Sequence, residues 1–206
     1  MAQIRCMEIY LVRHTTPQIA KGICYGQTDL DVTDTFLHEA GLIKKHLPQH
    51  FETIYSSPLQ RCSKLAATLF PKVTINHHHD LKEINCGIWE MQHWDAIPKQ
   101  DLDPFMADFV NIAMPQGESY IDLYGRVIKC FNAIITQPKP AVIITHGGVI
   151  RSILSHITNT PLIDSFNAFK LYYGCVVRLT ADGEHFKYDV LHNIEPLQAE
   201  QHKPST

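Results

Sequence analysis

The fold is decided by the stretch IYLVRHTT, residues 9–16, in which a β-rich apolar run ends at an arginine, a histidine and a turn. The stretch AVIITHGG, residues 141–148, repeats this pattern far downstream. Such runs predict buried parallel strands, and open α/β sheets bind their ligands at the carboxyl ends of these strands. We therefore expect His14 and His146 to face one crevice. The arginine beside the first histidine indicates phosphate chemistry.

Length and charge set the broad class of the protein. At 206 residues with 45% hydrophobic content, the chain can bury a full core, and we expect one domain over residues 1–206. Lysine and arginine number 18 against 21 acidic residues, which gives a formal charge of −3. Nucleic-acid-binding proteins usually carry a basic face, so this balance argues against a nucleic-acid partner.

The cysteines and the N-terminus bear on the location of the protein. Six cysteines are scattered without a CxxC pair, which favours reduced thiols in the cytoplasm over disulfides or a zinc knuckle. The N-terminal apolar stretch is short and interrupted by Glu8, so we expect neither a signal peptide nor a membrane span. A cytoplasmic location without membrane contact is the resulting prediction.

Apolar runs alternate with segments of helical period along the rest of the chain. The spacing of apolar residues predicts helices over 33–47, 59–69, 118–135 and 148–157. Further strands are expected at 53–56 and 73–75, and a closing hairpin is expected from 171–179 and 186–191 around Asp182-Gly183. This alternation predicts a three-layer α/β/α sandwich with a mostly parallel sheet and the hairpin as its antiparallel edge.

The pattern breaks down between about residues 81 and 117, where glycine and prolines recur. We expect loops and short helices laid over one end of the sheet, which is the usual place of a functional lid. The tail from about 195 to 206 is polar, and we expect it to be frayed. The aromatic region 166–177 could pair edge to edge in a homodimer.

Three of the expected strand ends carry polar residues that suit phosphoryl transfer. Arg13 and Arg61 can each present a bidentate fork to phosphate oxygens. A neutral His14 imidazole can attack phosphorus, and His146, either as a cation or as a hydrogen-bond donor, can hold the transferring oxygens. Each residue alone is as well explained by ordinary packing or solvation. Their convergence at one end of the sheet is what indicates a site.

A proton donor for the leaving group is expected at the start of the 81–117 region. Glu83 or Glu90 could be buried against Trp89 and the apolar residues of the lid. Such burial would raise the pKa of the carboxyl group enough for it to act as an acid.

These motifs together resemble the histidine phosphatase superfamily, also called the phosphoglycerate mutase-like family. The resemblance rests, in order, on RH at 13–14, SPLQRC at 57–62, LxExxxGxWE at 81–90, GES at 117–119 and THGG at 145–148. It covers roughly residues 7 to 180. Several independent motifs in the right order are far more specific than an Arg-His pair alone.

The resemblance implies a role for each matching residue. His14 would be the phosphorylated nucleophile, Glu83 the proton donor, and the phosphate pocket would contain Arg13, Arg61 and His146. Glu90 matches a commonly acidic position, to which we assign a structural role such as binding backbone amides. The family needs no metal or organic cofactor for catalysis, and none is expected here.

The segment after His14 departs from the family pattern. Most members follow the histidine with glycine and carry an asparagine further on, where this chain has Thr15-Thr16-Pro17 and Ala20. The work of that asparagine could pass to the hydroxyl of Thr15 or Thr16, to a backbone N–H, or to nothing. The variant segment, continued by KGICYGQTDL at 21–30, is most similar to the α-ribazole phosphatase branch, which removes the 5′-phosphate of α-ribazole phosphate late in cobalamin assembly.

Two further features each have a plain and a functional interpretation. Tyr25 and Gly26 are most simply a core residue and a turn residue, but their loop must pass near the pocket mouth. Tyr25 could therefore stack on a ring such as dimethylbenzimidazole, and Gly26 could let the backbone approach the ligand. Adjacent histidines in HHHD, residues 77–80, point to opposite faces of an extended segment, so we expect solvated surface and no metal site.

Several functions are compatible with these residues. The chain is short for a mutase that retains a bisphosphorylated intermediate, which favours hydrolysis of a small phosphorylated metabolite. α-Ribazole 5′-phosphate is the first candidate substrate, and a broad-specificity phosphatase for sugar phosphates or for phosphohistidine on proteins is the second candidate function. A third candidate, of a different class, is a non-catalytic binder of a phosphorylated ligand, because the segment after His14 is altered. Fold alone does not decide among them.

Overall fold

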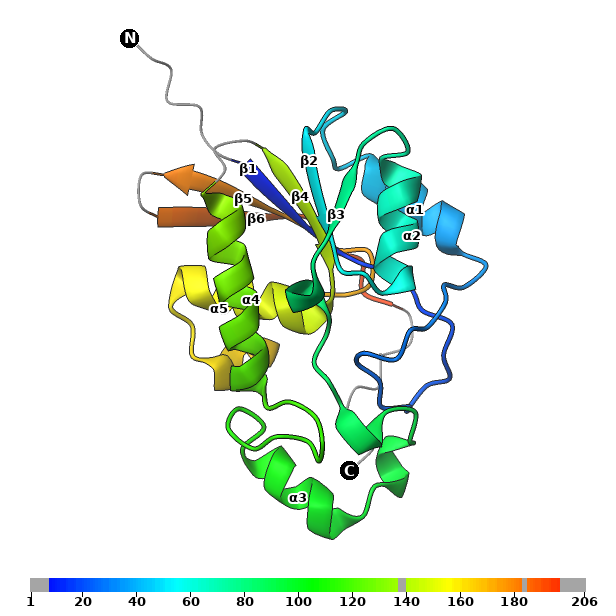
Figure 1. Cartoon of the computed structure of the whole chain (residues 1–206), viewed down its shortest axis with the longest axis vertical. Coiled ribbons are helices and arrows are strands. Elements are labelled where there is room, and N and C mark those ends of the chain that lie inside the picture. The colour runs from blue at the N-terminus through cyan, green and yellow to red at the C-terminus, as the bar shows by residue number, and fades with distance from the viewer. Residues whose placement is uncertain (1–7, 137–139, 183–184, 197–206) are drawn as a thin grey trace.

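A six-stranded sheet forms the centre of the computed structural model, which describes residues 8–136, 140–182 and 185–196 (Figure 1). The strands are β1 (Glu8–Arg13), β2 (Thr53–Ser56), β3 (Ile75–His77), β4 (Ala141–Thr145), β5 (Val176–Asp182) and β6 (His185–His192). Their order in the sheet is β3-β2-β4-β1-β5-β6. The strands β1 to β4 are parallel, whereas β5 pairs antiparallel with both β1 and β6. The predicted mostly parallel sheet with an antiparallel hairpin at its edge is confirmed.

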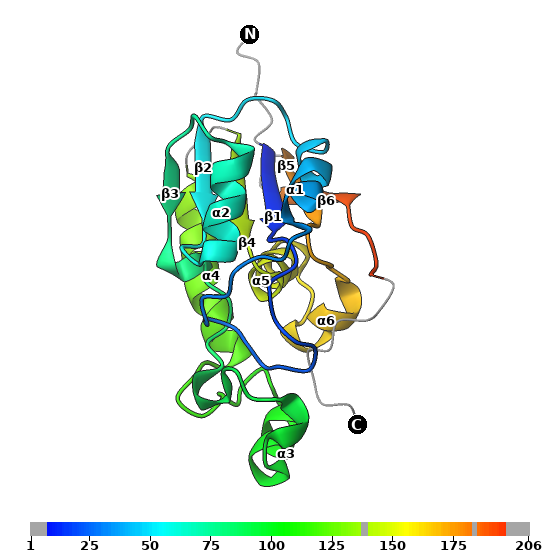
Figure 2. The same ribbon diagram turned by 90° about the vertical axis from the view of Figure 1, so that its right-hand side faces the viewer.

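Helices cover both faces of this sheet. They are α1 (Phe36–Lys44), α2 (Gln60–Leu69), α3 (Lys99–Ala107), α4 (Tyr120–Ile135), α5 (Gly147–Thr158) and α6 (Ser165–Ala168). Short 3-10 turns lie at η1 (His79–Leu81), η2 (Gly87–Trp89), η3 (Trp94–Ala96) and η4 (Leu162–Asp164). The helices α1 and α2 pack on one face and α4 and α5 on the other, which completes the predicted three-layer sandwich (Figure 1, Figure 2).

The side chains of β1 divide between the two helical layers. Ile9 and Leu11 belong to the core that includes α4 and α5, whereas Tyr10 and Val12 belong to the core that includes α1 and α2. All four are at most 5% exposed. Because both faces of the sheet are covered, the central strands are continuous apolar runs, and this is why the sequence pattern indicated buried parallel strands.

The closing hairpin differs in detail from its prediction. The strand β5 begins at Val176, five residues later than expected, and Phe166 lies in α6. Because β5 is paired on both sides, with β1 and with β6, the region 166–177 is not a sheet edge. The prediction that this region could pair edge to edge in a homodimer is therefore wrong. Gly183 in the predicted turn and residues 197–206 of the tail lie outside the described residues.

The region 81–117 forms the expected loops and short helices and has a small core of its own. Trp89, Trp94 and Phe105 are buried there, with the rings of Trp89 and Phe105 edge to face at 5.3 Å between centroids. The helix α3 lies far from the sheet (Figure 2) and contains Pro104, which lacks the N–H for an intrahelical bond. The apolar contacts of α3 therefore hold it in place more than its own helical propensity does.

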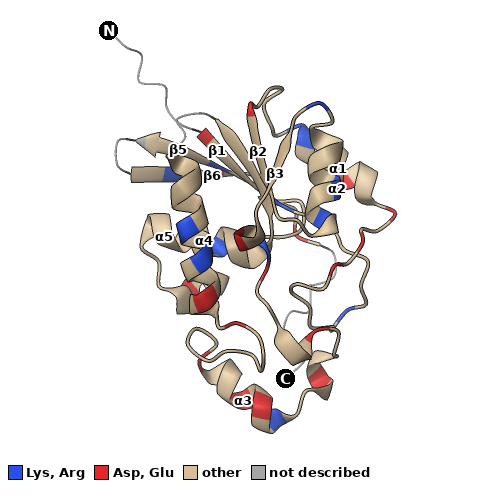
Figure 3. Ribbon diagram, in the orientation of Figure 1, with Lys and Arg blue, Asp and Glu red and all other residues tan. Residues whose placement is uncertain are grey.

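Charges of both signs are distributed over the molecule. Figure 3 shows lysine and arginine interspersed with aspartate and glutamate on the helices of both outer layers. Within the described parts of the chain, no helix is both long enough and apolar enough to cross a bilayer.

Glu90 connects the region 81–117, called the lid from here on, to the loop that follows β1. Its carboxylate accepts the backbone N–H groups of Gly26, Gln27 and Thr28 at 3.0, 2.8 and 3.1 Å, and also the Thr28 hydroxyl and the Cys86 N–H. Burial alone would raise the pKa of Glu90, but these donors outweigh it, and the pKa is lowered. The prediction that Glu90 could serve as the proton donor is therefore wrong, and its role is the structural one of binding backbone amides.

The burial of β4 predicts a large stability effect. Ile143 is 0% exposed and packs in the core that includes α4 and α5. We expect Ile143→Ala to lower the free energy of unfolding by about 2–5 kcal/mol, because it removes buried methyl groups and leaves a cavity. Leu37→Ala, at a position 72% exposed on α1, is the control and should change that free energy by less than about 0.5 kcal/mol. Urea denaturation measures both, and similar losses would contradict the assigned core.

The bonds of Glu90 predict a pH-dependent stability effect. Because the folded-state pKa of Glu90 is lowered, its carboxylate stabilises the fold above the unfolded-state pKa, and this contribution is lost as the pH falls through the folded-state pKa. Glu90→Gln should therefore be less stable than wild type at neutral pH, with a difference that narrows below about pH 4. Urea denaturation over this range checks the convergence. The control is Asp103→Asn, an exposed change on α3, which should be as stable as wild type at every pH in this range.

Candidate active site

The strand register brings the polar strand ends together. The strands β1 and β4 pair with Arg13 opposite Thr145, so the next residues, His14 and His146, leave the sheet side by side. Their imidazole rings are edge to face, with centroids 5.1 Å apart. The strand β2 ends on the other side of β4 and leads into α2, which carries Arg61. The three strand ends that the sequence singled out thus meet at one end of the sheet.

The hydrogen bond of His14 determines which ring nitrogen can react. Its Nδ1 lies 2.7 Å from the carbonyl oxygen of Thr15. Because a carbonyl oxygen only accepts, Nδ1 carries the proton, and the lone pair that can attack an electrophile lies on Nε2. Backbone bonds to Thr145 O at 2.9 Å and from Gly174 N at 3.0 Å hold the residue in place. The nucleophile that the sequence predicted is therefore held in a fixed tautomer and position.

Two buried arginines flank the histidines, and backbone carbonyls fix both guanidinium groups. Arg13 donates from Nη1 to Leu171 O at 2.6 Å. Arg61 donates from Nη1 to Thr28 O at 2.8 Å and from Nη2 to Gly26 O at 2.6 Å. The Nε of Arg61 is buried and has no hydrogen-bond partner among the described residues. Fixed guanidinium groups of this kind suit the oxygens of a phosphate group.

Burial keeps the second histidine neutral. His146 is fully buried, and its pKa lies well below the usual value, first because of burial and then because of the nearby charge of Arg61. Its Nε2 lies 2.8 Å from Ser57 Oγ, which also accepts the N–H of Leu59 at 3.3 Å. A hydroxyl oxygen can accept two hydrogen bonds, so this contact is compatible with a proton on either ring nitrogen of His146. The lowered pKa of His146 favours the neutral hydrogen-bond donor, one of the two roles considered for this residue.

A buried thiol beside His146 is not a second nucleophile. The Sγ of Cys62 lies 3.5 Å from His146 Nε2. Burial raises the pKa of this thiol to about 12, so it stays protonated and packs as a small apolar group.

The N-terminus of α5 contributes further positive potential to the site. His146 is the N-cap of this helix, and Gly147 and Gly148 are its first residues. A Cβ added at Gly147 would lie 3.1 Å from Arg151 Nη1 and 3.4 Å from Arg13 Nε, so two guanidinium groups border the helix start. Burial and the charge of Arg13 lower the pKa of Arg151. The helix dipole adds to this attraction for an anion.

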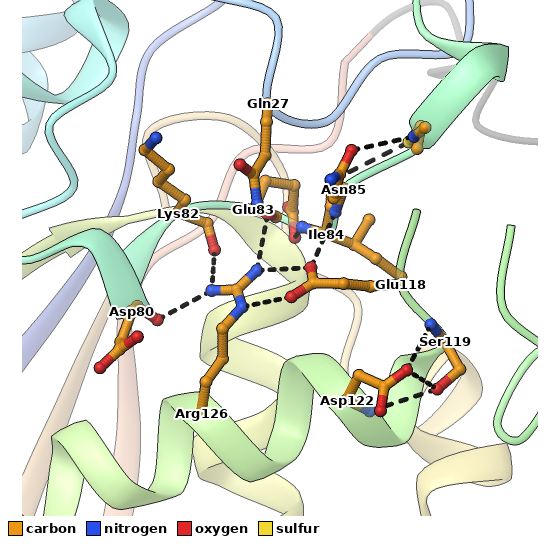
Figure 4. Close-up of polar contacts among 12 residues, drawn as sticks. Gln27, Asp80, Lys82, Glu83, Ile84, Asn85, Glu118, Ser119, Asp122 and Arg126 are labelled. Carbon is orange, nitrogen blue, oxygen red and sulfur yellow. Dashed lines mark hydrogen bonds and ion pairs between the residues drawn. The ribbon is translucent and has the colours of Figure 1, made fainter. Parts of the chain in front are cut away.

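Glu83 is held at the start of the lid, against the same helix terminus. Its Oε2 accepts the Gly148 N–H and its Oε1 accepts the Ile84 N–H, both at 3.0 Å. A Cβ at residue 148 would lie 2.3 Å from Glu83 Oε1, so a larger residue there would displace the carboxylate from this position. Figure 4 shows Glu83 on a short segment whose backbone is hydrogen-bonded by Arg126 and Glu118. The predicted proton donor therefore reaches the site from the side of α5.

The structure separates the two threonines that follow His14. Thr15 is fully buried, and its hydroxyl has no hydrogen-bond partner within the described residues. Thr16 is bound to α1 instead, because its N–H and its hydroxyl both donate to Glu39 Oε2, at 2.8 and 3.1 Å. The Thr16 hydroxyl is therefore bonded to Glu39 and does not point at the histidines. Ala20, at the place of the family asparagine, is exposed.

Two tyrosines lie over the arginines of the site, and the sequence pointed to only one of them. Tyr25 has its ring centroid 5.6 Å from the guanidinium carbon of Arg61, and Tyr173 has its ring centroid 4.0 Å from that of Arg13. Their hydroxyl oxygens are 2.5 Å apart. Tyr173 also lies 5.5 Å from the His14 ring, between centroids. Tyr173 precedes β5 and reaches the site because β5 pairs with β1. This pairing joins distant parts of the chain, so no local sequence motif predicts it.

Packing within the protein accounts for Gly26. A Cβ at this residue would lie 1.8 Å from Ile84 O. The N–H of Gly26 donates to Glu90 and its carbonyl accepts from Arg61. The space that the sequence prediction gave to a ligand is therefore occupied by the backbone of the lid.

Two other site residues were within reach of sequence reasoning. Ser57, which bonds His146, begins the SPLQRC motif, and Arg151 follows Gly147 by one helical turn. In the described part of the chain, no group of three or more histidine, cysteine or acidic residues is arranged to hold a metal ion, the stretch 77–80 included. A fixed imidazole lone pair, buried cations and a carboxylate are the parts needed to transfer a phosphoryl group.

Comparison with known sequences identifies the family. The family model for the histidine phosphatase superfamily (branch 1) matches residues 9–194. A metal-independent phosphoserine phosphatase from Arabidopsis thaliana is 30% identical over 164 residues, which are 73% of this chain and 68% of that protein. A 6-phosphofructo-2-kinase/fructose-2,6-bisphosphatase from the same plant is 28% identical over 129 residues, and the match spans 60% of this chain but only 17% of that protein's length.

Solved structures share the fold. The α-ribazole phosphatase from Shigella flexneri has a TM-score of 0.81 at 20% identity, over 94% of this chain and 100% of that chain. YhfR from Bacillus stearothermophilus has a TM-score of 0.79 at 25% identity, over 92% of this chain and 98% of that chain. The resemblance found in the sequence motifs is thereby confirmed. The chain belongs to the histidine phosphatase superfamily and is a phosphatase.

Proposed function

We propose that this protein hydrolyses a small phosphomonoester in two steps, through a phosphohistidine at His14. The observation that carries this proposal is the 2.7 Å bond from His14 Nδ1 to Thr15 O, in a pocket that contains the buried Arg13 and Arg61. It supports a nucleophilic Nε2 surrounded by fixed positive charge.

In the first step, His14 Nε2 attacks phosphorus and forms a P–N bond while the bond from phosphorus to the ester oxygen breaks. The leaving oxygen takes a proton from Glu83, whose carboxyl group lies against the N-terminus of α5. Arg13, Arg61 and the neutral His146 bind the equatorial oxygens and offset the negative charge that spreads over them.

In the second step, water attacks the phosphorus of the phosphohistidine and the P–N bond breaks. The Glu83 carboxylate, ionised in the first step, accepts a proton from this water, and inorganic phosphate leaves. The bonding electron pair returns to His14 Nε2, which restores the starting enzyme. Neither step calls on a metal or an organic cofactor.

Thr15 takes the place of the asparagine that most family members carry. Its hydroxyl is buried next to His14 and has no partner among the residues described, which supports a bond to a phosphate oxygen. Thr16 is less well suited, because Glu39 holds its hydroxyl.

The proposed substrate is α-ribazole 5′-phosphate. The altered segment Thr15-Thr16-Pro17 supports this substrate, as do the rings of Tyr25 and Tyr173, which can pack on an aromatic leaving group. Five cysteines in the described residues are free and buried, which supports a reducing, cytoplasmic location. The second candidate is a broad-specificity phosphatase for sugar phosphates or for phosphohistidine on proteins. The 30% identity to a metal-independent phosphoserine phosphatase makes phosphoserine a further substrate to compare.

The nucleophile assignment predicts the loss of a covalent intermediate. We expect His14→Ala to lower the rate of p-nitrophenyl phosphate hydrolysis by about 10³-fold or more, because His14 carries the phosphoryl group in the proposed mechanism. The wild type should form an acid-labile phosphoryl adduct that this variant lacks. His38→Ala, an exposed change on α1, should leave both properties unchanged. A binder without catalysis would instead show ligand affinity, no turnover and no adduct in the wild type.

The substrate assignment predicts an order of specificity constants. We expect kcat/KM for α-ribazole 5′-phosphate to exceed that for phosphoserine, sugar phosphates and a phosphohistidine peptide by about tenfold or more. Tyr25→Ala should reduce this preference because the ring is lost, whereas Tyr25→Phe should retain most of it. Steady-state kinetics with the four substrates measure the order. An even profile would favour the broad-specificity phosphatase, and a preference for phosphoserine would contradict the proposed substrate.

A further inference from the structure

The Gly117-Glu118-Ser119 motif takes no part in the steps above, yet it packs against the segment that carries Glu83. Ser119 begins α4 with a capping box, in which its side chain accepts the Asp122 N–H and the Asp122 carboxylate accepts the Ser119 N–H. Gly117 approaches the lid so closely that a Cβ there would lie 2.3 Å from Asn85 O. The motif thus joins the start of α4 to the residues just after Glu83.

Arg126, two turns along α4, hydrogen-bonds the backbone of the segment that leads to Glu83. Its guanidinium group donates from Nε and Nη2 to the two Glu118 carboxylate oxygens, at 2.7 and 2.8 Å. The remaining N–H groups donate to the carbonyls of Asp80 at 2.9 Å, Lys82 at 2.7 Å and Glu83 at 2.8 Å (Figure 4). All five donors of this side chain are therefore used.

Glu118 binds the same segment at Asn85, two residues after Glu83. Its Oε2 accepts the Asn85 N–H at 2.9 Å, and its own N–H donates to Asn85 O at 2.9 Å. The side chains of Arg126 and Glu118 are only 17% and 21% exposed, so water competes little for these bonds. The backbone of Glu83 is thus fixed on both sides, by carbonyl bonds at and before it and by amide bonds after it.

We propose that the Arg126–Glu118 ion pair positions Glu83 as the proton donor of the reaction. This inference rests on the proposed function, because it assumes that Glu83 protonates the leaving oxygen. A general acid must lie within hydrogen-bond reach of that oxygen, and a misplacement of about 1 Å can cost about 100-fold in rate. The ion pair holds the Glu83 backbone, and the Gly148 N–H then directs the carboxyl group. Arg126 and Glu118 are positioning residues and contact no reacting atom.

The geometry predicts that lysine cannot replace Arg126. A lysine ammonium group has three donors at one point, whereas the segment and Glu118 take five N–H groups from a planar fork. Arg126→Lys therefore keeps the charge but weakens the hold on Glu83, whose carbonyl retains, among the described residues, only the Gln27 Nε2 donor at 3.1 Å.

The test compares two esters that differ in their need for an acid. p-Nitrophenolate leaves without protonation, whereas the alkoxide of glycerol 2-phosphate needs a proton. We expect Arg126→Lys to lower kcat/KM for glycerol 2-phosphate by about 100-fold and for p-nitrophenyl phosphate by less than about fivefold. Glu118→Gln should show the same selective loss, and it supplies the comparison if Arg126→Lys does not fold. Arg178→Lys, in an exposed pair with Asp189, is the control and should change neither value.

A double variant separates positioning from a general structural effect. In the Glu83→Gln background, Arg126→Lys should cause little further loss with glycerol 2-phosphate, because the acid it positions is already absent. Equal losses for the two esters, or full additivity with Glu83→Gln, would overturn the inference while the wild-type activity left the proposed function intact. A wild type that hydrolysed neither ester would overturn the proposed function itself, and the role of the ion pair with it.

Discussion

The parallel pairing of β1 with β4 is the constraint on which the rest of the structure depends. It sets Arg13 opposite Thr145 and so places the rings of His14 and His146 5.1 Å apart. Alternate side chains of β1 enter two different apolar cores, so the pairing with β4 is buried on both faces of the sheet. A slip of one residue would exchange the side chains that face the two cores. The geometry of the site is thus stabilised by the apolar surface buried behind it.

This arrangement places several cations in a site with little access to water, and the chain has to solvate them. Arg13 and Arg61 are at most 5% exposed, and their N–H groups donate to carbonyls of Leu171, Gly26 and Thr28. Carbonyl dipoles stabilise a guanidinium group without cancelling its charge, as a carboxylate partner would. Burial first, and the nearby charge of Arg61 second, lower the pKa of His146 in the same site.

Local patterns in the sequence were sufficient for the strands, the sandwich and the residues at the strand ends, because each of these is signalled within one short segment. What they could not give depends on contacts between distant segments. Tyr173 reaches the site only through the β1–β5 pairing, and Glu39 draws the Thr16 hydroxyl away from it. Gly26 was assigned to a ligand because the approach of Ile84 O is invisible in the sequence. The predicted start of β5 is too early, because the apolar residues just before the strand have the same composition as the strand itself.

Glu83 and Glu90 are carboxylates of one short segment with different surroundings, and the mechanism proposed above gives them different tasks. Glu90 receives four backbone N–H groups and a hydroxyl, and this set of donors holds it ionised as an anchor between the lid and the loop after β1. Glu83 accepts two N–H groups and lies where a Cβ at residue 148 would meet its Oε1 at 2.3 Å. A carboxylate saturated with donors has no oxygen left to exchange a proton with a substrate. In the proposed mechanism Glu83 keeps that capacity, because its carboxylate accepts only two N–H groups from the described residues and Arg126 adds a bond to its backbone carbonyl.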